Sequence, residues 1–465
     1  MKLLETYYRT GPEVDTFEVA QPLSVESGYF CFGSGNVCFG RTSGGNLSAT
    51  PNDVLYDTSK DIVVSPGRVA LPFDPCEIIA NLSLERYATR ATNAVAKFFG
   101  NFTRHTYYAL RPYLPLGLRS EIQRIYLGDW RRLTFPRWPV DTTVNILFKR
   151  LLALQLRASG LSRIPFIWFW PNGAKAAVIM THDVEEEQGL EFCPTLAALN
   201  GEFNIPASFQ FVPEDRYRVS SQELESLRLA GFEVNVQDLN HDGRLYWDLE
   251  EFRRRADRIN HYAEVFGALG FRSGVLYRKQ EWFKYLNFEY DMSVPNVAHL
   301  DPQRGGCCSV MPYFIGNMLE LPVTTSQDHT IFHVLHDYTI ALWRHQISIS
   351  LKQNGLISFI VHPDYVIDTR ARQVYGNLLA ELNRLRDEEN VWLALPGQVN
   401  RWWRQRSAMT LVETEGNWKI QGEGAEQACF AFAILSGDEV EFDIPTRRRS
   451  EVKLQSCSEN HRAEP

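Results

Sequence analysis

The chain has 465 residues, of which 44% are hydrophobic and 22% charged, a composition typical of globular proteins. Single hydrophobic cores seldom grow beyond about 250–300 residues, so we expect more than one domain. The formal net charge of -8 gives no electrostatic reason to expect nucleic acid or an anionic membrane as a partner.

The first residues and the cysteines predict a cytoplasmic protein. Glu5 and Arg9 interrupt the apolar stretch that a secretory signal would need. The longest aromatic and apolar run, residues 164–170, is too short to span a bilayer. The eight cysteines include no Cys-x-x-Cys pair, and in a reducing compartment we expect them to be free thiols.

Residues 1–165 predict an α+β region of unknown role. Glycines punctuate short aromatic runs near residues 29–40, which indicates a small sheet, and a helical pattern follows over residues 83–107. Residues 133–141 are rich in proline and aromatic residues, which is typical of an extended connector packed on a surface.

From residue 176 to residue 406 apolar strands alternate with amphipathic helices. The predicted strands cover residues 176–180, 207–212, 232–236, 270–276, 290–294, 318–323, 356–361 and 391–395. Such alternation indicates parallel strands, and about eight units close most naturally into a barrel. The competing fold, an open doubly wound sheet, usually shows a glycine-rich loop after its first strand, and this chain has none there. We therefore predict a distorted (β/α) barrel of seven to eight parallel strands over residues 166–406.

After residue 406 the helical patterns stop. Short strand-like runs occur at residues 410–412, 417–421, 428–435 and 439–444, which predicts a small β module over residues 407–465. The last twenty residues are charged and poor in apolar groups, so we expect a disordered tail.

Ionisable and polar residues follow the predicted strands of the barrel. They are Asp183 and Glu185, Gln237 and His241, Arg272, Asp291 and Ser293, and His362 and Asp364. In this type of barrel the loops after the strands converge on one mouth. The sequence therefore predicts one active site that is built from five strands.

Five segments resemble the motifs of the NodB-type polysaccharide deacetylases of carbohydrate esterase family four. These segments are Thr181-His-Asp-Val-Glu185, Gln237-Asp-Leu-Asn-His241, Phe271-Arg-Ser273, Tyr290-Asp-Met-Ser293 and Ile360-Val-His362. In that family they correspond to an aspartate motif, a histidine-pair motif, an arginine motif, a second aspartate motif and a final histidine. The resemblance covers only the middle of the chain.

The resemblance implies metal-assisted hydrolysis of an N-acetyl group on a carbohydrate. It implies Asp183 as the general base, oriented by Arg272, and His362 as the acid that protonates the departing amine. A divalent metal, with zinc as the expected ion, would be held by Glu185, His241 and Gln237. Asp291, Ser293 and Asp364 are the expected substrate contacts.

Gln237 departs from the family pattern, which has a metal-binding histidine at this position. An amide oxygen is a poorer ligand for zinc than imidazole is, and it suits harder ions. Three alternatives follow: a weakly bound metal with slow catalysis, a site that works without metal, or a sugar-binding pseudoenzyme. We favour an active deacetylase, and a hydrolase of a non-sugar amide is a further alternative.

Some polar residues of the region have simpler interpretations. His182 alternates with Asp183 along its strand and is expected to face away from the mouth, in a structural hydrogen bond. The Asp328-His329 pair is more often a surface cap than a substrate contact. Trp402 and Trp403 are expected to lock a helix between the barrel and the terminal β module.

Overall fold

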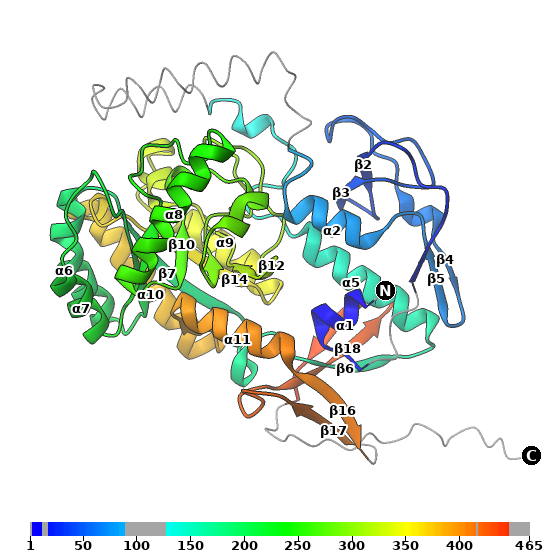
Figure 1. The fold of residues 1–465 in the computed structure, drawn as a ribbon. Helices are drawn as coiled ribbons and strands as arrows, with labels where there is room; N and C mark the ends of the chain where they lie inside the picture. The colour runs from blue at the N-terminus through cyan, green and yellow to red at the C-terminus, as the bar shows by residue number, and fades with distance from the viewer. Residues whose placement is uncertain (1, 12–16, 89–126, 415–416, 446–465) are drawn as a thin grey trace, which may run out of the picture.

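The computed structural model describes residues 2–11, 17–88, 127–414 and 417–445. Figure 1 shows the chain as two bodies: a barrel-like layer of helices and strands (green to yellow), and beside it the N-terminal elements together with the C-terminal strands. Within the described residues, no helix is both long enough and apolar enough to cross a bilayer.

The barrel is built on one sheet of nine strands, in the order β12-β13-β11-β10-β9-β8-β7-β14, with β15 paired to β7. Its strands are β7 (Ala177–Val184), β8 (Ala207–Phe211), β9 (Glu233–Gln237), β10 (Gly270–Arg272), β11 (Tyr290–Asp291), β12 (Tyr313–Ile315), β13 (Met318–Glu320), β14 (Leu356–Ile360) and β15 (Trp392–Ala394). Apart from the antiparallel pair β12 and β13, neighbouring strands run parallel. The predicted distorted barrel is confirmed. All eight predicted strands are present, although β10, β11 and β13 are shorter than predicted, and the antiparallel β12 is an additional strand.

The strand order also argues against the doubly wound alternative. From β7 to β11 each strand lies beside the next strand of the chain, which is the order of a curling sheet rather than of a sheet that reverses at a switch point. Side-chain hydrogen bonds from the segment that follows β13 to the backbone of β14 complete the curl of the sheet. Thr324 Oγ1 donates to the carbonyl of Leu356 at 3.0 Å, and Thr325 Oγ1 donates to that of Ser358 at 2.7 Å.

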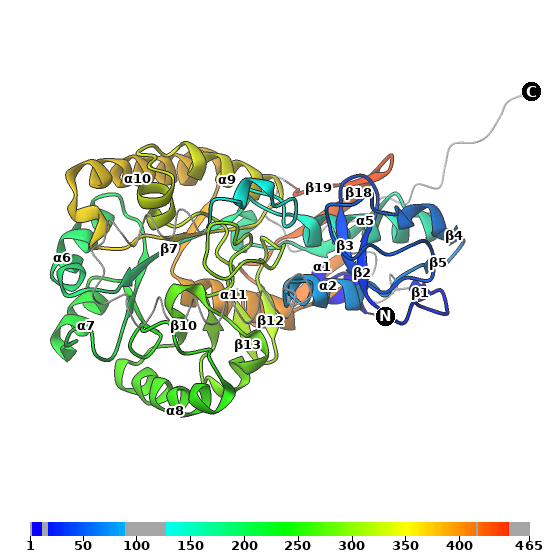
Figure 2. The ribbon, with the colours of Figure 1, turned by 90° about the horizontal axis from the view of Figure 1, so that it is seen from above.

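Helices surround this sheet, as Figure 2 shows from above. They are α6 (Glu187–Glu202), α7 (Ser221–Leu229), α8 (Leu249–Phe266), α9 (Ala341–Lys352), α10 (Thr369–Glu389) and α11 (Pro396–Ala408). A capping box of Ser220 and Glu223, whose serine and glutamate spacing is visible in the sequence, opens α7. Helix α8 begins at the cap of Asp248 and ends at Gly267, whose φ of 58° suits glycine. The sequence signals therefore set the ends of these helices correctly.

In the described part of the N-terminal region there are two small sheets and three α-helices. One sheet has the order β1-β5-β4 and the other pairs β2 with β3. The strands are β1 (Phe17–Val19), β2 (Gly28–Cys31), β3 (Val37–Gly40), β4 (Val63–Ser65) and β5 (Arg68–Leu71), and the helices are α1 (Leu3–Tyr8), α2 (Pro75–Ser83) and α5 (Thr143–Ala158). The helical stretch predicted for residues 83–107 is wrong at residues 84–88, which form turns, and its remainder lies outside the described residues. Helix α5 was not predicted.

The C-terminal strands do not stand by themselves. Strands β16 (Thr410–Thr414) and β17 (Asn417–Gln421) form one antiparallel pair, and β18 (Phe430–Ser436) pairs with β19 (Glu439–Asp443). On its other edge β18 pairs with β6 (Arg163–Ile167), which precedes the barrel in the chain. The four predicted strands are confirmed, and they join a core shared with the N-terminal region.

Helix α11 fastens these elements to the barrel. The fully buried Arg406 donates to the carbonyls of Ile167 at 2.7 Å and Trp168 at 2.9 Å, and to Tyr7 of α1 at 3.1 Å. Trp402 Nε1 donates to the carbonyl of Phe169 at 2.8 Å, and Trp403 is buried as well. The predicted locking role of the two tryptophans is consistent with these contacts.

The N-terminal region also docks on the barrel through a buried ion pair. Arg278 Nε donates to Glu85 Oε2 at 2.6 Å, and a second guanidinium nitrogen contacts Glu85 Oε1. Glu85 also accepts the backbone N–H of Gly306 at 2.6 Å. A charge buried with this many partners becomes costly when one partner is removed.

We expect Arg278→Leu to lower the free energy of unfolding by about 3 kcal/mol, because it leaves the buried Glu85 carboxylate without its countercharge. Chemical denaturation measures the change. Arg344→Leu is the matched control, since Arg344 pairs with Glu381 while its side chain is 59% exposed, and we expect a loss below about 1 kcal/mol. Equal losses in the two variants would contradict the interpretation.

Candidate active site

The ends of four barrel strands bring most of the predicted site residues together. Asp183 lies at the end of β7 and Glu185 follows it, Gln237 ends β9, Arg272 ends β10, and His362 follows β14. Strand β14 pairs in parallel with β7, and Ile360 lies opposite Thr181. Because the pairing is parallel, His362 emerges at the same edge as Asp183 and Glu185.

Glu185 is the centre of this group. Its Oε1 atom lies 2.8 Å from His241 Nε2, 3.0 Å from Gln237 Nε2 and 3.5 Å from His362 Nε2. Burial alone would raise the pKa of Glu185, but the neighbouring His241 and His362 outweigh burial and hold its pKa well below the usual range. Glu185 is therefore ionised at neutral pH.

Asp183 is more deeply buried and is paired with an arginine. Arg272 Nη1 lies 3.7 Å from Asp183 Oδ2, and Gln237 Nε2 donates to the same oxygen at 3.4 Å. Arg272 also donates to Thr181 Oγ1 at 2.9 Å, which fixes the guanidinium in place. Burial raises the pKa of the Asp183 carboxyl, and Arg272 and His362 oppose that rise. A carboxylate of raised pKa is a better proton acceptor than an exposed one.

His362 forms a dyad with a residue that the sequence did not assign to the site. His362 Nδ1 lies 2.6 Å from Asp328 Oδ1, and the His362 backbone N–H donates to Asp328 Oδ2 at 2.7 Å. Burial would lower the pKa of His362, but Asp328 and then Glu185 outweigh it and raise this pKa well above its usual value. The dyad leaves Nε2 facing the two carboxylates, protonated at neutral pH.

The interpretation of Asp328 as a surface cap is wrong, because its carboxyl is fully buried. Asp328 lies eight positions after the end of β13, in a segment without a regular pattern. The pairing of Asp328 with His362 depends on the path that the chain takes from β13 to β14. In the sequence, only the adjacent pair Asp328-His329 indicated that this segment could contribute to a site.

Asp291 and Ser293 lie inside the barrel rather than at an open surface. Both are fully buried, and Asp291 accepts from the Ser293 hydroxyl at 2.7 Å and from its backbone N–H at 2.8 Å. Glu320 lies opposite Asp291 in the parallel register of β11 and β13. Burial, followed by the Asp291 charge, raises the pKa of Glu320 well above its usual value. A role of Asp291 and Ser293 in substrate contact stays a prediction.

Two further residues were considered from the sequence. Asp364 is partly buried, and burial, opposed by His362, raises its pKa to about 6; its proposed contact with substrate stays a prediction. His182 is fully buried, with Nδ1 3.1 Å from the Val361 carbonyl and Nε2 2.7 Å from Asn200 Nδ2. Burial lowers its pKa to about 4, so His182 is a neutral structural residue, as expected.

Three of these side chains could hold a metal ion. Asp183, Glu185 and His362 each offer one ligand atom, and these atoms lie within 4.8 Å of one another. Two carboxylates and one imidazole suit a divalent ion. Gln237 and His241, which the resemblance placed among the ligands, instead direct nitrogen atoms at Glu185.

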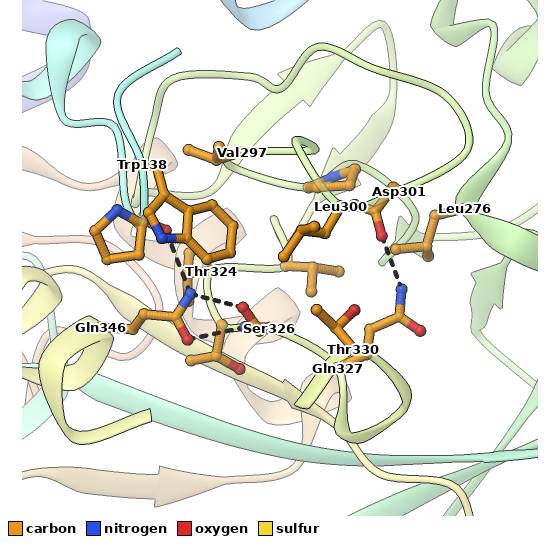
Figure 3. A pocket seen from close by; sticks show the side chains of 14 residues that line it. Trp138, Leu276, Val297, Leu300, Asp301, Thr324, Ser326, Gln327, Thr330 and Gln346 are labelled. Atoms are coloured by element: carbon orange, nitrogen blue, oxygen red, sulfur yellow. Dashed lines mark hydrogen bonds between the residues drawn. The ribbon is translucent and has the colours of Figure 1, made fainter. Parts of the chain in front are cut away.

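A small enclosed cavity lies beside the Asp328 segment (Figure 3). Its lining includes Thr324–Gln327 from the barrel and Trp138 and Pro139 from the connector. Gln346 Nε2 donates to Ser326 Oγ at 3.1 Å, and Gln327 donates to Asp301 Oδ1 at 3.3 Å. A free volume of about 20 Å³ suffices for roughly one water molecule. Trp138 and Pro139 of the connector therefore lie against this side of the barrel.

The fold and these side chains together define a curled parallel barrel that carries a carboxylate and histidine site at the ends of its strands. No family model matches the chain, and no curated protein matches it.

Several solved structures resemble this fold. A protein named as a polysaccharide deacetylase from Mycobacterium smegmatis is 20% identical with a TM-score of 0.42, and the match covers 54% of this chain and 97% of that one. A second one, from Pseudomonas aeruginosa PAO1, is 14% identical with a TM-score of 0.41, covering 50% and 93%. The Puue allantoinase is 14% identical with a TM-score of 0.39, covering 50% and 92%.

We expect Asp328→Asn to lower the free energy of unfolding by about 3 kcal/mol at pH 6, because it removes the carboxylate that stabilises buried, charged His362. The folded-state pKa of His362 is raised, so this stabilisation is complete below the unfolded value of about 6.5 and disappears as pH rises through the folded value.

Denaturation of both proteins across a pH series measures this difference. Asp257→Asn is the control, because Asp257 is exposed on α8. A difference between Asp328→Asn and the natural protein that grows with pH would contradict the assignment.

Proposed function

We propose that the chain hydrolyses an amide bond and removes the acetyl group from an N-acetylated sugar or a polysaccharide precursor. The observation that supports this proposal most is the short distance between a proton acceptor, Asp183, and a proton donor, His362. Asp183 and His362 offer atoms within 4.8 Å of one another, and each has its own partner, Arg272 for Asp183 and Asp328 for His362. This separation suits the attacking water and the leaving nitrogen of one amide.

In this proposal the two residues have complementary tasks. Asp183 accepts a proton from the water whose oxygen attacks the acyl carbon. His362 donates the proton on Nε2 to the nitrogen as the carbon–nitrogen bond breaks, so acetate and a free amine leave. Arg272 keeps Asp183 oriented, and Asp328 keeps His362 protonated between turnovers.

A divalent ion fits the same place. Asp183 and Glu185 would hold it with His362 nearby, and it would supply Lewis acidity that polarises the acyl oxygen. We assign a proton to His362 and not a bond to the ion, because the Asp328 carboxylate favours the protonated ring. Zinc is the ion that the motif resemblance implies.

The carbohydrate substrate rests on the resemblance of the five motifs. Two rivals remain distinct: a sugar-binding pseudoenzyme on the same barrel, and a hydrolase that acts on a non-sugar amide. A pseudoenzyme would bind N-acetylated sugars without releasing acetate. A non-sugar hydrolase would release acetate or another acid from amides that lack a sugar ring.

Asp183→Asn and His362→Asn should each lower the rate of acetate release from N-acetylated sugar oligomers by at least about 100-fold, because each removes one proton transfer. Released acetate and free amine are measured together, since hydrolysis yields them in equal amounts. Asp257→Asn and His261→Asn make the same chemical changes at exposed positions of α8 and should keep full activity. Unchanged turnover in either site variant would contradict the assignment.

Glu185→Gln should weaken the binding of manganese or zinc about tenfold or more, because it removes one of the two carboxylate ligands. Equilibrium dialysis followed by elemental analysis measures the bound ion. Glu264→Gln, at an exposed position of α8, should leave the affinity unchanged. Equal affinity in Glu185→Gln would show that the ion binds elsewhere.

A further inference from the structure

The side-chain amide of Gln237 bridges the two carboxylates of the site. Its Nε2 atom donates to Glu185 Oε1 at 3.0 Å and to Asp183 Oδ2 at 3.4 Å. An amide nitrogen carries two hydrogens and no lone pair that it can offer to an ion. Gln237 is 1% exposed and lies beside Arg272 in the register of β9 and β10. Its nitrogen thus occupies the place between two acidic groups where positive charge is needed.

The ring of His241 lies against the same oxygen, with its Nε2 atom 2.8 Å from Glu185 Oε1. On the other side, Arg216 Nη2 donates to the His241 carbonyl at 2.9 Å. Arg216 is itself held by Glu186 at 2.8 Å.

Buried carboxylates that converge need either a cation or several hydrogen-bond donors. Asp183 is 3% exposed, and the side chain of Glu185 is 16% exposed, so water can meet little of this need. The protein supplies a donor from the end of β9. Gln237 stands at a position where the resemblance implied a metal ligand.

We propose that Gln237 is a positioning residue that holds Asp183 and Glu185 together by hydrogen bonds in place of a cation. This inference deepens the proposed function, on which it rests for the importance of the two carboxylates. The site keeps its geometry without a bound ion, and an ion, when present, adds to a framework that the side chains already maintain.

The decisive variant is Gln237→Glu, which keeps the size of the side chain and replaces a donor with a third carboxylate. In the presence of EDTA its melting temperature should fall by about 5 °C or more relative to the natural protein, because like charges converge without water. A millimolar excess of Mn²⁺ should recover at least half of that fall and should shift the natural protein less.

Gln222→Glu is the matched control, because this substitution makes the same chemical change at a residue that is exposed on α7. Its melting temperature should stay within about 1 °C of the natural protein. The proposal is overturned if Gln237→Glu and the natural protein have the same melting temperature in EDTA. It is also overturned if Mn²⁺ raises the melting temperatures of these two proteins equally.

A second measurement covers the case in which Gln237→Glu does not fold. Gln237→Met removes the donor without adding charge, so its melting temperature should fall by about 2 °C or more, with no recovery in Mn²⁺. A melting temperature equal to that of the natural protein would overturn the proposal.

None of these readouts uses turnover, so a protein that gives the expected results but releases no acetate would refute the proposed function alone.

Discussion

The parallel pairing of β7 is the constraint on which the rest of the structure depends. This strand is buried along its whole length and is hydrogen-bonded to β8, β14 and β15. Its beginning is held by β15 and its end by β8, so its register cannot slip without breaking three sets of pairs. Because β14 runs parallel to it, Asp183 and His362 reach the same edge, although they lie far apart in the chain. The chemistry of the site follows from that single register.

A second feature of the structure is that each of its main buried charged groups contacts a complementary polar or charged group. Glu185 lies among three nitrogen atoms, Asp183 faces Arg272, and His362 faces Asp328. The same rule holds far from the site, where Glu85 meets Arg278. Each charged group has a partner contributed by a different segment of the chain. A substitution that removes one partner therefore affects both local stability and the arrangement of the site.

The sequence predicted the parts of the structure that depend on local pattern. Alternation of strands and helices was enough for the barrel, and residues that follow apolar strands identified Asp183, Glu185 and His362. Contacts set by tertiary packing were not predictable in this way. Asp328 follows no strand directly, and the donor role of Gln237 depends on the direction of its amide between two carboxylates. The pairing of β6 with β18 also joins segments that no local pattern connects.

That last pairing bears on how the protein acquires its structure during synthesis. Strand β6 is made before the barrel and β18 after it, and Ile167 finds its partner Phe430 only when the whole barrel lies between them. Contacts between such distant residues cost loop entropy before they return any stability, and they slow folding. Until β18 has been synthesised, this edge of β6 therefore lacks its partner strand, and the core that the two ends of the chain share cannot be complete.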